Sequence, residues 1–322
     1  MMCVKWNIKC VSVLIWPVLF LLTASCPGEI LYVSPEGNDA WTGRFDKANI
    51  EGTDGPLASL TGARDRIRQL KLTVSLTEPV RVIVAQGVYR LDQPLVLEVQ
   101  DSGTARCPII YEAAPQARPV FSGGRVIKGF RPYKEGIWQA HVPAVAQGDW
   151  YFEQLFVDGQ RAMRARTPNR FYFYMQTVKE EKLGRPTPIG ATHRQTVTVR
   201  AEDLRPLAQL DSSELCDVHM MIYHKWDNTR RFIHSLDPNK RQIITEGRNM
   251  KSWNPWRSNT RYHLENFRDA LDAPGEWFLD RDGSLYYKPL PGQDMNQAEV
   301  VAPLVEKFIV IKGEPAAQRF VQ

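Results

Sequence analysis

Five carboxylates and four aromatic side chains fall within the 22 residues DALDAPGEWFLDRDGSLYYKPL, at positions 269–290. Paired carboxylates perform glycoside hydrolysis, and aromatic rings can stack against sugars. The spacing favours a β-hairpin instead, because residues 276–279 and 284–287 resemble strands and residues 280–283 carry the Asp and Gly of a tight turn. Strand alternation places Trp277 and Leu279 on one face and leaves Glu276 as the one carboxylate able to face a groove.

A second group of polar and aromatic residues comes from IYHKWDNTRRFI (222–233) and RYHLEN (261–266). It combines a stacking surface, a cation and a carboxylate, as sugar-binding sites do. Alternation along a strand predicts that His224 and Trp226 share a face. The alternative is a strand pair whose polar groups bond one another. Together with Glu276, the candidate substrate-binding residues are His224, Trp226, Arg230, Tyr262, His263 and Glu265.

Two further segments carry ambiguous signals. In SWNPWRSN (252–259), Trp253 and Trp256 would form a stacking platform if exposed and would close the domain if buried. Arg164 and Arg166 precede a Pro turn on one strand face, where packing or ion pairing is favoured over anion capture. No CxxC pair, HExxH motif or metal-ligand spacing of histidines occurs, so we expect neither a metal site nor a cofactor.

The N-terminus has the pattern of an export signal over residues 1–25. Lys5 and Lys9 precede an apolar run over 11–22 and small residues at 23–25. Cleavage before Cys26 gives a secreted or periplasmic protein. The alternative is lipidation of Cys26, which gives an outer-membrane lipoprotein. We therefore expect contact with a membrane only through the signal peptide or through this lipid. The remaining cysteines, Cys107 and Cys216, permit either a disulfide or free thiols.

The charge balance excludes one class of partner. Without the two signal lysines, 39 basic residues face 36 acidic ones, which gives no electrostatic reason to bind nucleic acid. The arginines within 164–170 and 228–231 could line a groove for an acidic polysaccharide, although short basic clusters are usually solvated surface.

The elements that position these residues are mostly strands. Residues 60–70 predict one amphipathic helix that Ser59 or Thr61 could cap. Short strand-like runs at 79–91, 93–99, 107–114 and 118–124 suit a meander or, more closely, a solenoid coil, because hairpin dipeptides are missing between them. We therefore expect coil turns over 26–126, an inserted antiparallel β domain over 127–298, and a resumed, truncated coil over 299–322.

The chain resembles secreted bacterial right-handed parallel β-helix proteins related to glycoside hydrolase families 120 and 141. The stretches that carry this resemblance are LYVSPEGNDAWTGRF, TDGPLASLTGARDRIR, RVIVAQGVYRLDQPLVLEVQDSGT, PIIYEAAPQARPVFSGGRVIKGF, LFVDGQRAMRARTPN and RYHLENFRDALDAPGEWFLDRDGSLYYKPLPG. It implies a mainly β fold, namely the start of a right-handed parallel β-helix with an N-terminal capping helix, interrupted by an inserted antiparallel β domain.

The resemblance also implies a function. Such enzymes cleave glycosidic bonds in plant-type polysaccharide, including xylosides and fucosylated pectin. Their catalytic carboxylates lie on later turns, which would follow Gln322, so the catalytic residues are unassigned here and we expect these residues alone to be inactive. The alternatives are a polysaccharide lyase of the same fold and a non-catalytic glycan-binding protein.

Overall fold

The computed structural model describes residues 28–187, 190–317, 319 and 321, so the predicted signal and Cys26 lie outside the described residues. The chain divides into two compact units. The first comprises Met1–Tyr89, Leu95–Val120 and Ile309–Gln322, and the second comprises Arg90–Pro94 and Phe121–Phe308. The second unit is therefore inserted into the sequence of the first. None of the helices among the described residues has the length and apolar character needed to cross a membrane.

The first unit contains the predicted helix, α1 (Leu60–Thr73). Ser59 caps it, with its side chain accepting a hydrogen bond from the backbone N–H of Gly62. Ala63 and Ile67 are buried on the predicted apolar face. The helix lies against β1 (Ile30–Val33) and β4 (Leu95–Glu98), and the expected helix is confirmed.

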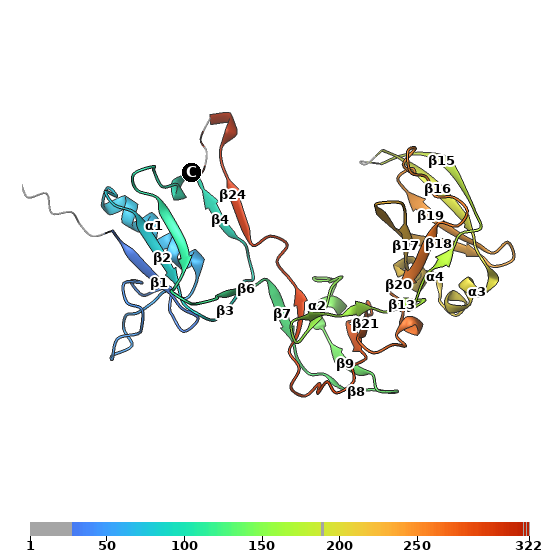
Figure 1. Ribbon diagram of the computed structural model, residues 1–322, viewed down its shortest axis with the longest axis horizontal. Coiled ribbons are helices and arrows are strands. Elements are labelled where there is room, and N and C mark those ends of the chain that lie inside the picture. Colours follow the sequence, from blue (N-terminus) through green and yellow to red (C-terminus); the bar gives the residue numbers. More distant parts are fainter. Residues whose placement is uncertain (1–27, 188–189, 318, 320, 322) are drawn as a thin grey trace, which may run out of the picture. The chain divides into compact units, whose positions relative to one another are not determined.

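The strands of the first unit pair in parallel. The sheet order is β1, β2 (Val80–Val84) and β5 (Ile109–Ala113), and β24 (Ile309–Lys312) pairs in parallel with β4 (Figure 1). A meander would pair consecutive strands antiparallel. The parallel pairing of these strands is therefore not that of a meander.

Antiparallel pairing dominates the second unit, although Met163–Arg164 and Glu276–Leu279 pair in parallel. One sheet has the order β11 (Gln160–Arg161), β10 (Phe156–Val157), β23 (Val300–Pro303) and β7 (Gly124–Ile127). Another has the order β12 (Met163–Arg164), β21 (Glu276–Leu279), β22 (Ser284–Tyr287), β9 (Trp138–His141) and β8 (Arg131–Pro132). The mainly β class and the inserted β domain are therefore as predicted.

The largest sheet carries most of the candidate site residues. Its order is β13 (Arg166–Thr167), β20 (Arg261–Glu265), β17 (His219–Tyr223), β18 (Asn228–Asp237), β19 (Gln242–Gly247), β16 (Gly190–Thr198) and β15 (Thr177–Thr187), with β14 (Phe173–Tyr174) also pairing with β20. The remaining strands are β3 (Val88–Arg90) and β6 (Val120–Ser122), and the short helices are α2 (Pro143–Ala146), α3 (Ala201–Leu204) and α4 (Ser212–Asp217).

The strand at residues 300–303 does not pair as predicted. We expected short parallel strands to resume near Val300, but β23 pairs antiparallel with β7 and β10 inside the second unit. The parallel pairing is made by β24, which belongs to the first unit and pairs with β4. The apolar composition of residues 300–303 suits either kind of partner, so composition did not separate the two pairings.

The hairpin predicted over residues 276–287 is present as β21 and β22. Asp280 Oδ1 accepts the N–H of Arg281 and Asp282 Oδ1 accepts that of Ser284, each at 2.7 Å. Gly283 has φ +84°, which a residue with a side chain rarely adopts. Two of the five carboxylates that suggested catalysis, Asp280 and Asp282, thus form a turn.

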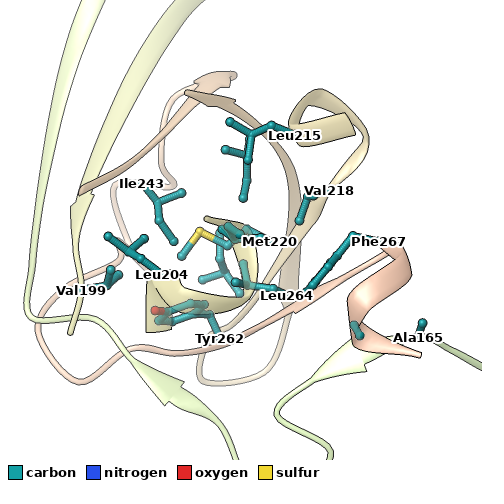
Figure 2. Packing of buried hydrophobic residues seen from close by; sticks show 14 of the residues in the cluster. Ala165, Val199, Leu204, Leu215, Val218, Met220, Ile243, Tyr262, Leu264 and Phe267 are labelled. Atoms are coloured by element: carbon teal, nitrogen blue, oxygen red, sulfur yellow. The ribbon is translucent and has the colours of Figure 1, made fainter. Parts of the chain in front are cut away.

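Two apolar clusters fill the second unit, and the hairpin contributes to both. Trp277 and Leu279 enter one cluster, whereas Phe278 enters the other, as strand alternation requires. Figure 2 shows part of the cluster that contains Phe278, in which Met220, Tyr262 and Leu264 point toward one another. Elsewhere, Cys107 is buried and Cys216 exposed, and both are free thiols.

Candidate functional site

The strands β17, β18 and β20 have one apolar and one polar face. The register aligns His219 with Glu265 and Phe232, Met221 with His263 and Arg230, and Tyr223 with Arg261 and Asn228. Because side chains alternate, these residues project to one side while Met220, Ile222, Tyr262 and Leu264 project into the core. We call the side that carries His219, Tyr223, Arg230, His263 and Glu265 the polar face.

Glu265 is the centre of the polar face. Its Oε1 lies 3.4 Å from His219 Nδ1, and its Oε2 lies 3.1 Å from His263 Nε2. Burial alone would raise the pKa of Glu265, but hydrogen bonds from the two histidines outweigh burial and lower that pKa to about 2. Glu265 is therefore ionised at neutral pH, and it can accept hydrogen bonds but supplies no proton.

Arg164, on β12, extends this cluster through His219. Its Nη1 lies 3.2 Å from His219 Nδ1, and its guanidinium lies 5.1 Å from the ring centroid of Trp277. His219 Nδ1 can accept from Arg164 or donate to Glu265, but one nitrogen cannot do both at once. Arg164 is 8% exposed, and burial lowers the pKa of its guanidinium. This arginine is thus held by packing and by the cluster, as the packing alternative predicted.

Arg230 lies at the exposed edge of the polar face. Its Nη1 donates to Glu153 Oε2 at 2.6 Å, and both side chains remain about half exposed. Arg231 points elsewhere, with Nη2 donating to the carbonyl oxygen of Arg248. Both arginines are thus engaged by protein groups.

His224 and Trp226 do not share a strand face, so that prediction is wrong. β17 ends at Tyr223, and residues 224–227 form a turn closed by the His224 N–H and the Asp227 carbonyl oxygen at 2.9 Å. The His224 side chain is 2% exposed, whereas Trp226 is 77% exposed. A reversal of the chain replaces the alternation that we extrapolated from the strand.

His224 instead fixes the segment 252–259. Its Nδ1 lies 3.1 Å from the carbonyl oxygen of Asn254, which can only accept, so Nδ1 carries the proton. Its Nε2 accepts from the Nε1–H of Trp256 at 3.1 Å, which fits that tautomer. Of the two tryptophans, Trp256 is 4% exposed and closes the domain, while Trp253 is 62% exposed.

Two other candidates are buried away from the polar face. The hydroxyl of Tyr262 donates to Asp203 Oδ2 at 2.8 Å inside the apolar core, and burial raises the pKa of both groups. Glu276 is 2% exposed, so the expectation that it faces a groove is wrong. Its Oε2 accepts the N–H groups of Asp272 and Ala273 at 3.1 and 3.0 Å, which closes the turn before β21.

A pocket of about 280 Å³ opens at the Tyr223 end of the polar face. It is lined by Tyr223, His224 and Lys225 on one side and by Asn254, Pro255 and residues 257–261 on the other. We call it the loop pocket. Tyr223 joins it to the polar face, because its hydroxyl lies 3.3 Å from His263 Nδ1. Sequence analysis singled out residues 222–233 and residues 252–259 separately, and it gave no indication that the two segments line one pocket.

A larger cavity, of about 780 Å³, lies in the first unit beside the C-terminal end of α1. No aromatic or histidine side chain lines it, and the aliphatic Leu70, Val74 and Leu76 do. The loop pocket has the better chemistry for a polar ligand. Among the described residues, no group of His, Cys, Asp and Glu side chains is arranged to hold a metal ion.

Comparison with known proteins finds a family model that matches most of the second unit. Residues 135–290 match the family model described as the GH141 insertion domain, that is, of glycoside hydrolase family 141. A solved structure titled a glycoside hydrolase superposes on 91% of the chain with a TM-score of 0.75 and 24% identity. The chain spans 49% of that protein's length. The resemblance to family 141 through its inserted domain is confirmed.

A second solved structure, of XylC in complex with xylose, superposes on 87% of this chain, and the match covers 32% of the XylC chain. The identity is 14% and the TM-score is 0.36. No curated protein matches the sequence.

Proposed function

Because residues 135–290 match the insertion domain of glycoside hydrolase family 141, we propose that the chain is the N-terminal portion of a glycoside hydrolase acting on plant-type polysaccharide. In this proposal the first unit forms the opening turns of a right-handed parallel β-helix. Support comes from its parallel strand pairs and from the superposition with a glycoside hydrolase. The second unit binds glycan at the loop pocket.

The observation that carries the glycan-binding proposal is the composition of the loop pocket. Tyr223 supplies a ring and a hydroxyl, and the lining also includes the amide and hydroxyl residues Asn254, Ser258, Asn259 and Thr260. Sugars are bound by such a combination of a flat apolar surface and several hydrogen-bonding groups. The Tyr223 ring is steadied by an edge contact with Tyr172, their centroids 5.0 Å apart.

The carboxylates of the candidate set support binding and not bond cleavage. A general acid needs a proton at the working pH, and Glu265 with a pKa of about 2 has none. Burial raises the pKa of Glu276, but this side chain is enclosed and closes a turn. We therefore propose that residues 1–322 alone cleave no glycosidic bond, with the acid and nucleophile supplied elsewhere in the whole enzyme.

Isothermal titration of the full chain with xylotriose and pectic oligosaccharides tests the binding proposal. Tyr223→Phe should weaken binding about fivefold by removing one hydrogen bond of about 1 kcal/mol. Tyr133→Phe is the matched control, because Tyr133 is an exposed tyrosine outside the loop pocket. An absence of binding, or equal loss in both variants, contradicts glycan binding at this pocket.

Hydrolysis assays with aryl-xyloside and aryl-fucoside test the proposed inactivity, and release of the aryl group contradicts it. An unsaturated, ultraviolet-absorbing product from polygalacturonate would instead identify a lyase.

We also propose export of the protein through residues 1–25. Mass spectrometry of the mature N-terminus distinguishes a chain beginning with an unmodified Cys26 from a lipidated one. Retention of residues 1–25 on the mature protein would contradict export by this signal.

A further inference from the structure

The loop pocket has an unbalanced charge. Three cationic side chains line it, namely Lys225 from the turn after β17, Arg257 from the segment before β20, and Arg261 at the start of β20. No Asp or Glu is among its lining residues. None of the three cations has an ion-pair partner among the described residues, so their charge is available to a ligand.

Two carboxylates outside the pocket lining are already engaged by other groups. Asp227 pairs with Lys251 and accepts from Asn254 Nδ2, and hydrogen bonding by Lys251 is the main cause that lowers the pKa of Asp227. Glu265, on the polar face, is held by His219 and His263. The surroundings therefore do not cancel the positive charge of the pocket lining.

The wall of the pocket is preorganised. His224 holds the 252–259 segment through Asn254 and Trp256, as described above. The guanidinium of Arg261 lies 5.2 Å from the ring centroid of Tyr172, a stacking contact that restricts its orientation. A guanidinium restricted in this way presents a planar fork of N–H donors, which matches a carboxylate.

From this arrangement we propose that the loop pocket recognises a sugar unit that carries a carboxylate, a uronic acid residue of an acidic glycan. The carboxylate binds between Arg257, Arg261 and Lys225, while Tyr223 and the amide and hydroxyl residues bind the ring hydroxyls. A pocket of about 280 Å³ suits one such unit. This inference rests on the proposed glycan binding and adds the chemical class of the sugar.

Titration of the full chain with trigalacturonate and with its methyl ester tests the inference, because the ester removes the negative charge of each carboxylate and adds only a methyl group. We expect the acid to bind at least tenfold more tightly than the ester and to weaken as sodium chloride is raised. Arg257→Gln and Arg261→Gln should each weaken binding of the acid about fivefold, with little change for the ester. Lys182→Gln, an exposed cation on β15, is the matched control and should change neither affinity.

The outcomes separate the two proposals. If the ester or xylotriose binds as tightly as the acid, or if both arginine variants keep the wild-type affinity for the acid, the uronate inference is overturned while glycan binding stands. If no acid, ester or neutral oligosaccharide binds, both proposals fail. Circular dichroism of each variant confirms that a lost affinity does not come from unfolding.

Discussion

Residues 262 and 263 are neighbours on β20, and they lie in opposite environments. Tyr262 is fully buried in the apolar core, whereas His263 belongs to the hydrogen-bonded cluster around Glu265. The same division separates Met220 from Met221 on β17. The core face derives its stability from apolar burial, and the polar face derives its own from paired charges. One strand therefore supplies both the scaffold and the proposed binding surface.

Identical substitutions at Met220 and Met221 provide the largest test of this difference. Met220→Ala should lower the free energy of unfolding by about 3 kcal/mol, because Met220 is fully buried and leaves a cavity. Met221→Ala should cost less than about 1 kcal/mol, since this side chain is partly exposed on the polar face. Urea unfolding of both variants measures the two values, and equal losses would show that the two faces are packed alike.

Glu265→Gln should also be costly, with a loss of about 3 kcal/mol at pH 7. The substitution removes the negative charge that His219, His263 and Arg164 surround. Glu153→Gln is the control, because its pair with Arg230 is exposed and should contribute less than about 1 kcal/mol. The two urea midpoints, measured at one pH, give the comparison.

The pH dependence of stability identifies the same carboxylate. The pKa of Glu265 is lowered from 4.5 to about 2 in the folded protein. Its contribution is therefore fully present above pH 4.5 and is lost as pH falls from 4.5 through 2. Urea unfolding from pH 6 to pH 2 should show a smaller loss of stability in Glu265→Gln than in the wild-type protein. Parallel curves for the two proteins would argue against a strongly lowered pKa.

His224→Phe should cost about 1 to 2 kcal/mol. The ring size is roughly retained, but the hydrogen bonds to Asn254 and Trp256 are lost, which leaves two buried polar groups without this partner. Looser packing of residues 252–259 should shift the fluorescence of Trp256 toward that of an exposed tryptophan. His234→Phe is the control, because the His234 side chain is about half exposed. An unchanged spectrum would show that His224 does not hold this segment.

The smallest effect is expected at Trp226. Trp226→Ala should change stability by less than about 0.5 kcal/mol and leave oligosaccharide affinity unchanged, since the side chain is 77% exposed and lines no part of the loop pocket. Titration with xylotriose measures the affinity. A clear loss of affinity would extend the proposed site to the turn at residues 224–227.

Prediction from the sequence succeeded where the signal is local. Alternation and turn residues placed the hairpin over 276–287, and Ser59 marked the start of α1. Prediction failed where a strand ended earlier than expected or where a turn buried a side chain. The chain reverses after Tyr223, which separates His224 from Trp226, and the turn over 272–276 encloses Glu276. Neither event leaves a periodic pattern in the sequence.

The sequence by itself determined the strand alternation, the helix and the hairpin, because each depends on residues close together in the chain. It also carried the resemblance of residues 135–290 to the GH141 insertion domain. Tertiary structure alone decided which face of β20 is buried, because that depends on the elements packed against it. It also brought Lys225, Arg257 and Arg261 to one pocket. These cations come from segments about 30 residues apart, and their approach is set by strand pairing between β17 and β20.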